Sequence, residues 1–274
     1  MESVFKKRIF GIRKEEESRM NRWVRKSQKA LRLIRSNPEE FWACVKLNLH
    51  PLFYSPKEAE ILLNNIRFQI VFDLDPVMKN MYYGLYETEI TSLLKKYLQE
   101  GDTFIDVGAN VGYLSAFALG LVGKTGEVHA FEPVPRYFER LKNIQRDNAG
   151  YNFFMNNFAA GENEGISSIA VTNLKNIGWN TIVPDFMDKN TIKEKIEVPV
   201  KRLDNYLSSN GIDNLRLIKI DTEGYEFPIF KGFQQYLCRA KRLPIIIVEI
   251  CPAAYPMLNL SVEDFLIDCV KTWL

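Results

Sequence analysis

Five short apolar segments alternate with helical patterns from Glu87 onward, and this alternation constrains the fold more than any other feature of the 274 residues. A helical pattern over residues 87–101 stops at Gly101, a residue type that favours the end of a helix. The apolar segments that follow are TFIDVGA, GEVHAFEP, NFFMNNFAA, LRLIKIDTEG and PIIIVEICP. Near-continuous apolar strands separated by helices predict an α/β fold with a mostly parallel sheet covered by helices on both faces.

Two further segments between the third and fourth of these strands predict a hairpin flap. They cover residues 167–183 and 195–200, and the first carries Trp179. An aromatic ring in a flap can stack on the face of a sugar, but it is about as often a packing residue. Both interpretations stay open at this point.

The N-terminal arm differs from the rest of the chain in charge. Residues 1–36 contain 12 Lys and Arg and 4 Glu, which leaves 24 basic and 30 acidic residues in 37–274. The apolar spacing within residues 21–36 predicts a basic amphipathic helix. This helix could contact an anionic membrane or an acidic partner, or it could pack on the protein itself with its charged face in solvent. The narrow apolar stripe favours packing on the protein itself. The mildly acidic body argues against nucleic-acid binding.

Cysteine usage and apolar run lengths bear on the compartment. The four cysteines form no C-x-x-C pair and no cluster with histidine at metal-ligand spacing, so neither a disulfide framework nor a zinc site is predicted. The longest apolar run, residues 111–122, is too short to span a membrane, and the first residues lack the apolar core of a secretory signal. The expectation is a cytoplasmic protein.

The turn in FIDVGANVGYLS resembles a nucleotide-binding loop but lacks the dinucleotide fingerprint. A G-x-G-x-x-G motif from Gly108 requires glycine at 110 and 113, where the chain has Asn110 and Tyr113. The remaining pattern joins Asp106, Gly108 and Gly112 to an acidic residue at the end of the next strand, Glu132. One carboxylate can accept hydrogen bonds from both ribose hydroxyls. The pattern therefore favours a nucleoside cofactor with an amino-acid tail, such as S-adenosylmethionine, with the loop amides and Asn110 near that tail.

The sequence resembles the FkbM family of methyltransferases from about Tyr83 to its end. The matching blocks, in order, are YETE, FIDVGANVGYLS, GEVHAFEPVPRYFERLKNI, NFAAGENEG, VKRLDNYL, LIKIDTEGYEFPIFKGF and PIIIVEICP. The resemblance implies a class I (Rossmann-like) methyltransferase fold and S-adenosylmethionine as cofactor. It also implies methyl transfer to an oxygen, such as a hydroxyl of a sugar, glycolipid or secondary metabolite. The predicted domains are a basic helical region over 1–82 and a methyltransferase domain over 83–274.

The resemblance also assigns roles by position. Asp106, Gly108, Asn110 and Gly112 match the cofactor loop, Glu132 the ribose carboxylate, Asn157 the adenine region, and Asp221 and Glu223 an acidic motif beside the sulfonium. The family's sheet continues beyond the helical segment SVEDFLIDCVKTWL into a final pair of strands. The expectation for this chain is therefore a fragment or a sheet without that terminal hairpin.

Methyl transfer to a hydroxyl requires a group that takes the proton. Of the two histidines, His129 lies within an apolar strand and His50 in the N-terminal region, so carboxylates are favoured. The hypothesis is that Asp221 or Glu223 orients or deprotonates the acceptor, with Glu249 completing an acidic pocket. The alternative is that Asp221 and Glu223 only cap the following helix. Three converging carboxylates could also hold a divalent metal such as Mg²⁺, which the sequence leaves open.

Two rival functions remain at this point. A nicotinamide-dependent oxidoreductase would use a similar sheet, but two of its three glycines are missing. A non-catalytic scaffold or membrane-surface protein would keep the fold and use the basic arm for binding.

Overall fold

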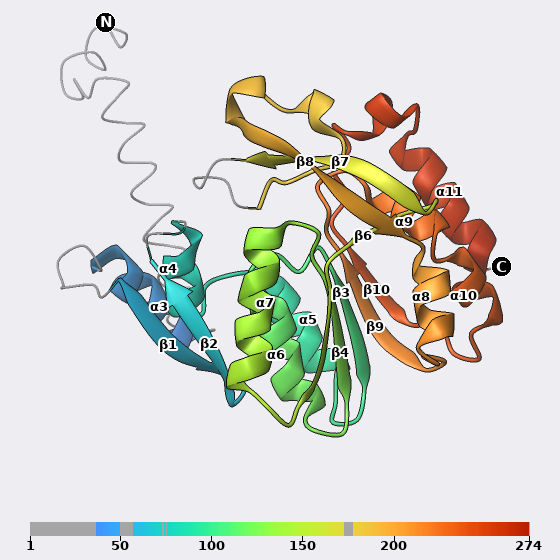
Figure 1. Ribbon diagram of the computed structural model, residues 1–274. Helices are drawn as coiled ribbons and strands as arrows, with labels where there is room; N and C mark the ends of the chain where they lie inside the picture. Colours follow the sequence, from blue (N-terminus) through green and yellow to red (C-terminus); the bar gives the residue numbers. More distant parts are fainter. Residues whose placement is uncertain (1–36, 50–56, 73, 75, 173–177, 274) are drawn as a thin grey trace, which may run out of the picture. The chain divides into compact units, whose positions relative to one another are not determined.

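The computed structural model describes residues 37–49, 57–72, 74, 76–172 and 178–273 (Figure 1). The basic helix predicted within residues 21–36 lies outside these residues. The chain divides into two compact units, residues 1–55 with 79–86 and residues 56–78 with 87–274. In the first unit, helix α3 (Pro38–Leu49) begins with a reciprocal cap: Asn37 accepts a hydrogen bond from the Glu40 amide, and its own amide group donates to the Glu40 carboxylate. Proline at the first helical position suits this start.

The second unit contains the five-stranded parallel sheet that the sequence predicts. Its strands are β3 (Thr103–Val107), β4 (Glu127–Phe131), β5 (Asn152–Asn156), β9 (Leu215–Ile220) and β10 (Ile245–Val248). They pair in the order β10-β9-β3-β4-β5, and each neighbouring pair is parallel. The predicted α/β fold is therefore confirmed.

Helices cover both faces of this sheet (Figure 1). One layer contains α5 (Thr88–Tyr97), α6 (Tyr113–Val122) and α7 (Pro135–Asp147), and the other contains α8 (Leu203–Ser209), α9 (Glu226–Lys231), α10 (Gln234–Arg239) and α11 (Val262–Trp273). Side chains alternate along each strand, so Ile105 and Val107 join the buried cluster on the α8–α11 side. Asp106, between them, faces the α6 layer, where its carboxylate accepts a hydrogen bond from Ser115 of α6.

The winding direction of the sheet reverses between β3 and β9. From β3 the chain winds outward through β4 and β5, and it then returns to place β9 on the other side of β3. In open α/β sheets, ligands bind at the carboxyl ends of the strands where the winding direction reverses. The candidate site is therefore expected where β3 and β9 end.

The predicted flap is also present. Strands β7 (Gly165–Thr172) and β8 (Ile192–Lys201) pair antiparallel, and the short β6 (Ala159–Ala160) joins the outer side of β8. The segment between β7 and β8 includes two short 3-10 turns, Pro184–Phe186 and Lys189–Thr191.

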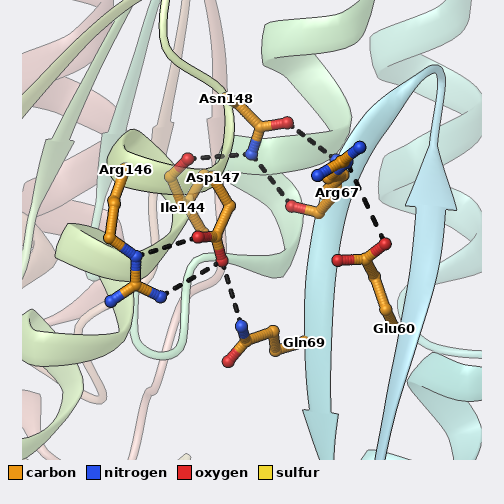
Figure 2. A network of polar contacts seen from close by, with 7 residues as sticks. All are labelled: Glu60, Arg67, Gln69, Ile144, Arg146, Asp147 and Asn148. Carbon is orange, nitrogen blue, oxygen red and sulfur yellow. Dashed lines mark hydrogen bonds and ion pairs between the residues drawn. The ribbon is translucent and has the colours of Figure 1, made fainter.

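A second hairpin was not placed from the sequence. Strands β1 (Glu58–Leu63) and β2 (Ile66–Val71) are joined by Asn64 and Asn65, both with positive φ, the conformation of a two-residue hairpin turn. The hairpin is fastened to α7 through Asn148, whose side chain bonds both the amide and the carbonyl of Arg67 (Figure 2).

Two shorter helical elements complete the description, α4 (Val77–Tyr82) and a 3-10 turn over Tyr255–Leu258. Within the described part of the chain, no helix combines the length and the apolar character that crossing a membrane demands.

Candidate active site

The glycine turn after β3 is shaped by close packing. Gly108 has φ +79°, and a Cβ built there would lie 1.9 Å from the carbonyl oxygen of Asp221. Gly112 has φ +84°, and its Cβ would lie 2.5 Å from side-chain atoms of Leu141 and Ile144 in α7. Both glycines are thus required for the approach of β3 to β9 and of the loop to α7.

The first amides of this turn are used within the protein. The amides of Gly108 and Ala109 donate to the carbonyl of Phe131, and the Asn110 amide donates to the Glu132 carboxylate. The expectation that the loop amides approach the cofactor therefore does not fit these three groups, because their hydrogen bonds stabilise the ends of β3 and β4. Asn110 itself has φ +53°, so the turn continues in the left-handed region.

Asp106 lies beneath this turn and is fully buried. Its Oδ2 accepts a hydrogen bond of 2.6 Å from Ser115, and its Oδ1 lies 3.4 Å from the ammonium of Lys219. Asp106 thus joins the end of β3 to α6 and to β9.

Lys219 is a site residue that the sequence reasoning missed. It occupies the position on β9 opposite Asp106 and is 5% exposed. Its ammonium lies 3.1 Å from the carboxylate of Asp221 and donates to the Gly108 carbonyl at 3.2 Å. The available signal was a single lysine within the apolar segment LRLIKI, because a buried lysine needs an anionic partner.

Glu132, the predicted ribose carboxylate, lies at the end of β4 and is 5% exposed. Its two oxygens each accept one backbone hydrogen bond of 2.8 Å, from Asn110 and from Val134. Burial raises the pKa of Glu132 to about 7, and the two amides and Lys219 act against that rise. Because each oxygen has a second lone pair, the carboxylate can still accept hydrogen bonds from a ligand.

Asn157 is placed beside Glu132. Its side-chain amide donates to the carbonyls of Glu132 and Pro133 at 2.9 and 3.1 Å. These bonds fix the backbone that carries Glu132, and the role of Asn157 toward an adenine ring stays a prediction.

The acidic motif follows β9, beside the glycine turn. Asp221 pairs with Lys219, and Glu223 adopts φ +53° in the turn that follows. Burial raises the pKa of Glu223 to about 7, and the nearby carboxylates of Asp221, Glu249 and Glu226 contribute to the rise. A carboxylate with a pKa near the working pH suits a general acid or base.

A different residue from those expected binds the turn before α9. Glu226, which is fully buried, accepts hydrogen bonds from the amides of Thr222 and Gly224 and from the Thr222 hydroxyl. Among the described residues no side chain caps α9, whose N-cap residue is Tyr225, so the capping considered for Asp221 and Glu223 is not present, and Glu226 instead binds the amides of the preceding turn.

Two more carboxylates belong to the acidic side. The pKa of Glu249 is raised, first by the charge of Asp221 and then by burial, which agrees with its predicted place in the acidic pocket. The pKa of Glu87 is raised by burial and by Asp221. The sequence does not single out Glu87 within YETE, because its approach to Asp221 depends on tertiary structure that spacing does not reveal.

The histidines do not compete for the role of base. His129 is buried in β4, where its ring hydrogen-bonds the Tyr206 hydroxyl at 2.8 Å and stacks on Phe154. Desolvation lowers its pKa, as expected of a packed core residue. His50 lies outside the described residues.

The flap is fastened to the acidic turn. The Thr181 hydroxyl donates to the Glu223 carbonyl at 2.7 Å, and a Cβ added to Gly224 would lie 3.6 Å from the Phe186 ring. Trp179, near this anchor, is 53% exposed. This exposure shows that Trp179 is not a core residue, and its role toward a ligand stays a prediction.

The metal hypothesis finds no support in the geometry. Over the residues with described positions, no group of three or more His, Cys, Asp or Glu side chains is arranged to hold a metal ion. Asp221 is instead paired with the ammonium of Lys219, at 3.1 Å.

Fold and site together define a doubly wound α/β protein with a nucleoside-type loop facing an acidic turn across its switch point. A family model, the methyltransferase FkbM domain, matches residues 106–271. The chain belongs to this family, which implies S-adenosylmethionine as its cofactor. The curated proteins searched gave no match.

Solved structures give distant likenesses. The fibrillarin/Nop5p complex is 14% identical over 67% of this chain and 66% of that chain, with a TM-score of 0.38. Aeropyrum pernix fibrillarin with natively bound S-adenosyl-L-methionine is 14% identical over 68% and 63%, with a TM-score of 0.34. An arsenic(III) S-adenosylmethionine methyltransferase from Chlamydomonas reinhardtii is 14% identical over 66% and 56%, with a TM-score of 0.31. The chain thus matches less than two thirds of each of these structures.

Proposed function

We propose that the protein is an S-adenosylmethionine-dependent O-methyltransferase that acts on a hydroxyl of a sugar, glycolipid or secondary metabolite. The observation that carries the proposal is the close packing, where β3 and β9 end, of the glycine turn against the turn that bears Asp221 and Glu223, with Glu132 bonded to the Asn110 amide of the glycine turn. Membership of the FkbM family supports the cofactor.

The residues fit the cofactor on the evidence of the site itself. Glu132 is a buried carboxylate whose oxygens are oriented by backbone amides and retain acceptor capacity for two ribose hydroxyls. S-adenosylmethionine supplies, when bound, an electrophilic methyl group on a sulfonium. Asp221 and Glu223 lie on the other side of Gly108, whose backbone contacts the Asp221 carbonyl. This side is where an acceptor hydroxyl would be oriented.

Proton removal is assigned to Glu223. With a pKa of about 7, it is largely ionised at slightly alkaline pH and can accept a hydroxyl proton. Asp221, held by Lys219, then orients the hydroxyl. The rate of methyl transfer is therefore expected to fall as pH decreases through about 7, because Glu223 becomes protonated.

A radiolabelled methyl-transfer assay against a panel of sugars, glycolipids and natural-product alcohols tests this proposal. Asp221→Asn and Glu223→Gln are expected to lower turnover by about a hundredfold, the usual contribution of a general base, while S-adenosylmethionine still binds. Glu139→Gln is the matched control, since Glu139 is 65% exposed on α7. Unchanged turnover in both site variants would refute the assignment.

A further inference from the structure

Lys219 lies within the candidate site, where it contacts the end of β3, the glycine turn and the acidic turn. One carboxylate partner, Asp106, belongs to the end of β3, and the other, Asp221, belongs to the acidic turn. The third contact is the Gly108 carbonyl, in the turn itself. Lys219 is 5% exposed, and a buried ammonium needs polar partners such as these three groups.

The backbone brings the same parts together. The Asp221 amide donates to the Val107 carbonyl at 3.1 Å, and Gly108 leaves no room for a side chain against the Asp221 carbonyl. The ends of β3 and β9 are therefore in direct contact, and Lys219 spans this contact from the α6 side of the sheet. Deleting the ammonium would leave two carboxylates facing each other where β3 and β9 end.

We infer that Lys219 is a positioning residue that locks the cofactor loop to the acceptor-side carboxylate Asp221, so that both halves of the site keep one geometry. The inference rests on the proposed function, because it assigns the two halves to the methyl donor and the acceptor. Near-attack geometry depends on such fixed placement of the reacting groups. Lys219 is not a catalytic residue in this account, since it acts through Asp106, Gly108 and Asp221.

Lys219 also acts on Glu132 through its charge. The charged and titratable groups that face Glu132 are Lys219 from β9, Asp106 from β3 and the phenol of Tyr137 from α7. Of these, Lys219 favours the ionised form of Glu132 and Asp106 opposes it. Loss of the lysine would therefore move the protonation of Glu132 to higher pH, an effect that a purely structural role would not produce.

The test measures the affinity of the full chain for S-adenosylhomocysteine by calorimetry between pH 6 and pH 9. Lys219→Met is expected to bind about tenfold more weakly, the effect of losing a hydrogen bond to a charged group. The pH at which affinity falls on acidification is expected to rise. Lys142→Met is the control, because Lys142 is 49% exposed and pairs only with Glu139 in the described salt bridges. Wild-type affinity and an unmoved midpoint in Lys219→Met would overturn the inference.

A second variant keeps the test decisive if Lys219→Met does not fold. Lys219→Arg retains the positive charge, but its planar guanidinium cannot reproduce the three contacts of the ammonium. We expect an unchanged pH midpoint with about tenfold weaker binding. Wild-type affinity in Lys219→Arg would show that a positive charge at this position is sufficient for binding. The positioning role of Lys219 would then be wrong.

Failure of the proposed function gives a different result. If the folded wild type binds no S-adenosylhomocysteine, the cofactor assignment fails. The effect of the Lys219 charge on the glutamate pKa values can then still be measured, by carbon-13 NMR titration of the glutamate carboxyls without ligand. Lys219→Met, or Lys219→Gln if methionine is not tolerated, is expected to raise the pKa of Glu132 and of Glu223, which Lys219 otherwise lowers. Unmoved titrations would overturn the role of Lys219 directly.

Discussion

The ligand-free wild type is expected to lose stability as pH rises, because Glu132 must ionise while buried. Replacing Glu132 by glutamine is expected to abolish this loss. Burial raises the pKa of Glu132 from 4.5 to about 7, so the folded state binds a proton more tightly than the unfolded state. The stability from this proton is fully present below pH 4.5 and is lost as pH rises through about 7. With 1.36 kcal/mol for each pKa unit, the loss between pH 5 and pH 8 amounts to about 2–3 kcal/mol.

The assay is urea unfolding of wild type and Glu132→Gln at pH 5 and pH 8. The glutamine is uncharged at both pH values, and its NH₂ group faces one backbone donor at both, so the cost of the glutamine itself does not change with pH. The difference in free energy of unfolding between variant and wild type should therefore shift in favour of the variant by about 2–3 kcal/mol between the two pH values. Glu139→Gln, on the surface of α7, should show no such shift.

Parallel pH dependence of wild type and Glu132→Gln would refute the reasoning, because it would mean that Glu132 is not desolvated in the folded state. The expected result would mean that ionised Glu132, the predicted ribose carboxylate, destabilises the ligand-free protein at alkaline pH. Perturbed carboxylates of this kind are commonly found at functional sites.

Two other predictions concern the packing around the site. Gly108→Ala is expected to destabilise the protein by more than about 3 kcal/mol, because a Cβ would lie 1.9 Å from the Asp221 carbonyl oxygen; Gly150→Ala, at φ +97° with open space around it, should cost only about 1–2 kcal/mol. Equal losses in urea unfolding would contradict the close approach of β3 and β9. Thr181→Val is expected to raise the KM for the acceptor and leave cofactor affinity unchanged, since Thr181 fastens the flap to the Glu223 carbonyl. A fall in cofactor affinity would place the flap on the donor side.

The main sheet could be predicted from the sequence because its signals are local. The central strands β3, β4 and β9 are buried on both faces and therefore form nearly continuous apolar runs such as TFIDV. The helices between strands have their own periodicity, and the order of the two patterns defines the fold class. The flap strands β7 and β8 were also identified from their composition.

The β1–β2 hairpin escaped prediction although its turn was readable. Asn64 and Asn65 separate two short apolar runs, and asparagine is favoured where both turn residues need positive φ. The prolines on either side, Pro56 and Pro76, obscured the pattern. What orients the hairpin is its bond to Asn148, a contact across 81 positions in the chain that no local pattern contains.

Only those parts of the candidate site that have a local sequence signal could be predicted. Glu132 could be found because its spacing from the glycine turn is a sequence property. Lys219 and Glu226 act through partners that only the fold brings together. Lys219 pairs with Asp106 on the neighbouring strand, and Glu226 binds the Gly224 amide within a tight turn. Glu226 binds the amides of the turn, whereas Glu223 has a raised pKa. Which of the two glutamates does which depends on side-chain directions that the order of residues does not determine.

The measurement that tests the central claim most directly is calorimetric titration of the purified chain with S-adenosylmethionine and S-adenosylhomocysteine, with Glu132→Ala as control. We predict saturable binding of both ligands by the wild type, and loss of binding in the variant, because the carboxylate that accepts the ribose hydroxyls is removed. Absence of binding by the folded wild type, or equal binding by Glu132→Ala, would contradict the account.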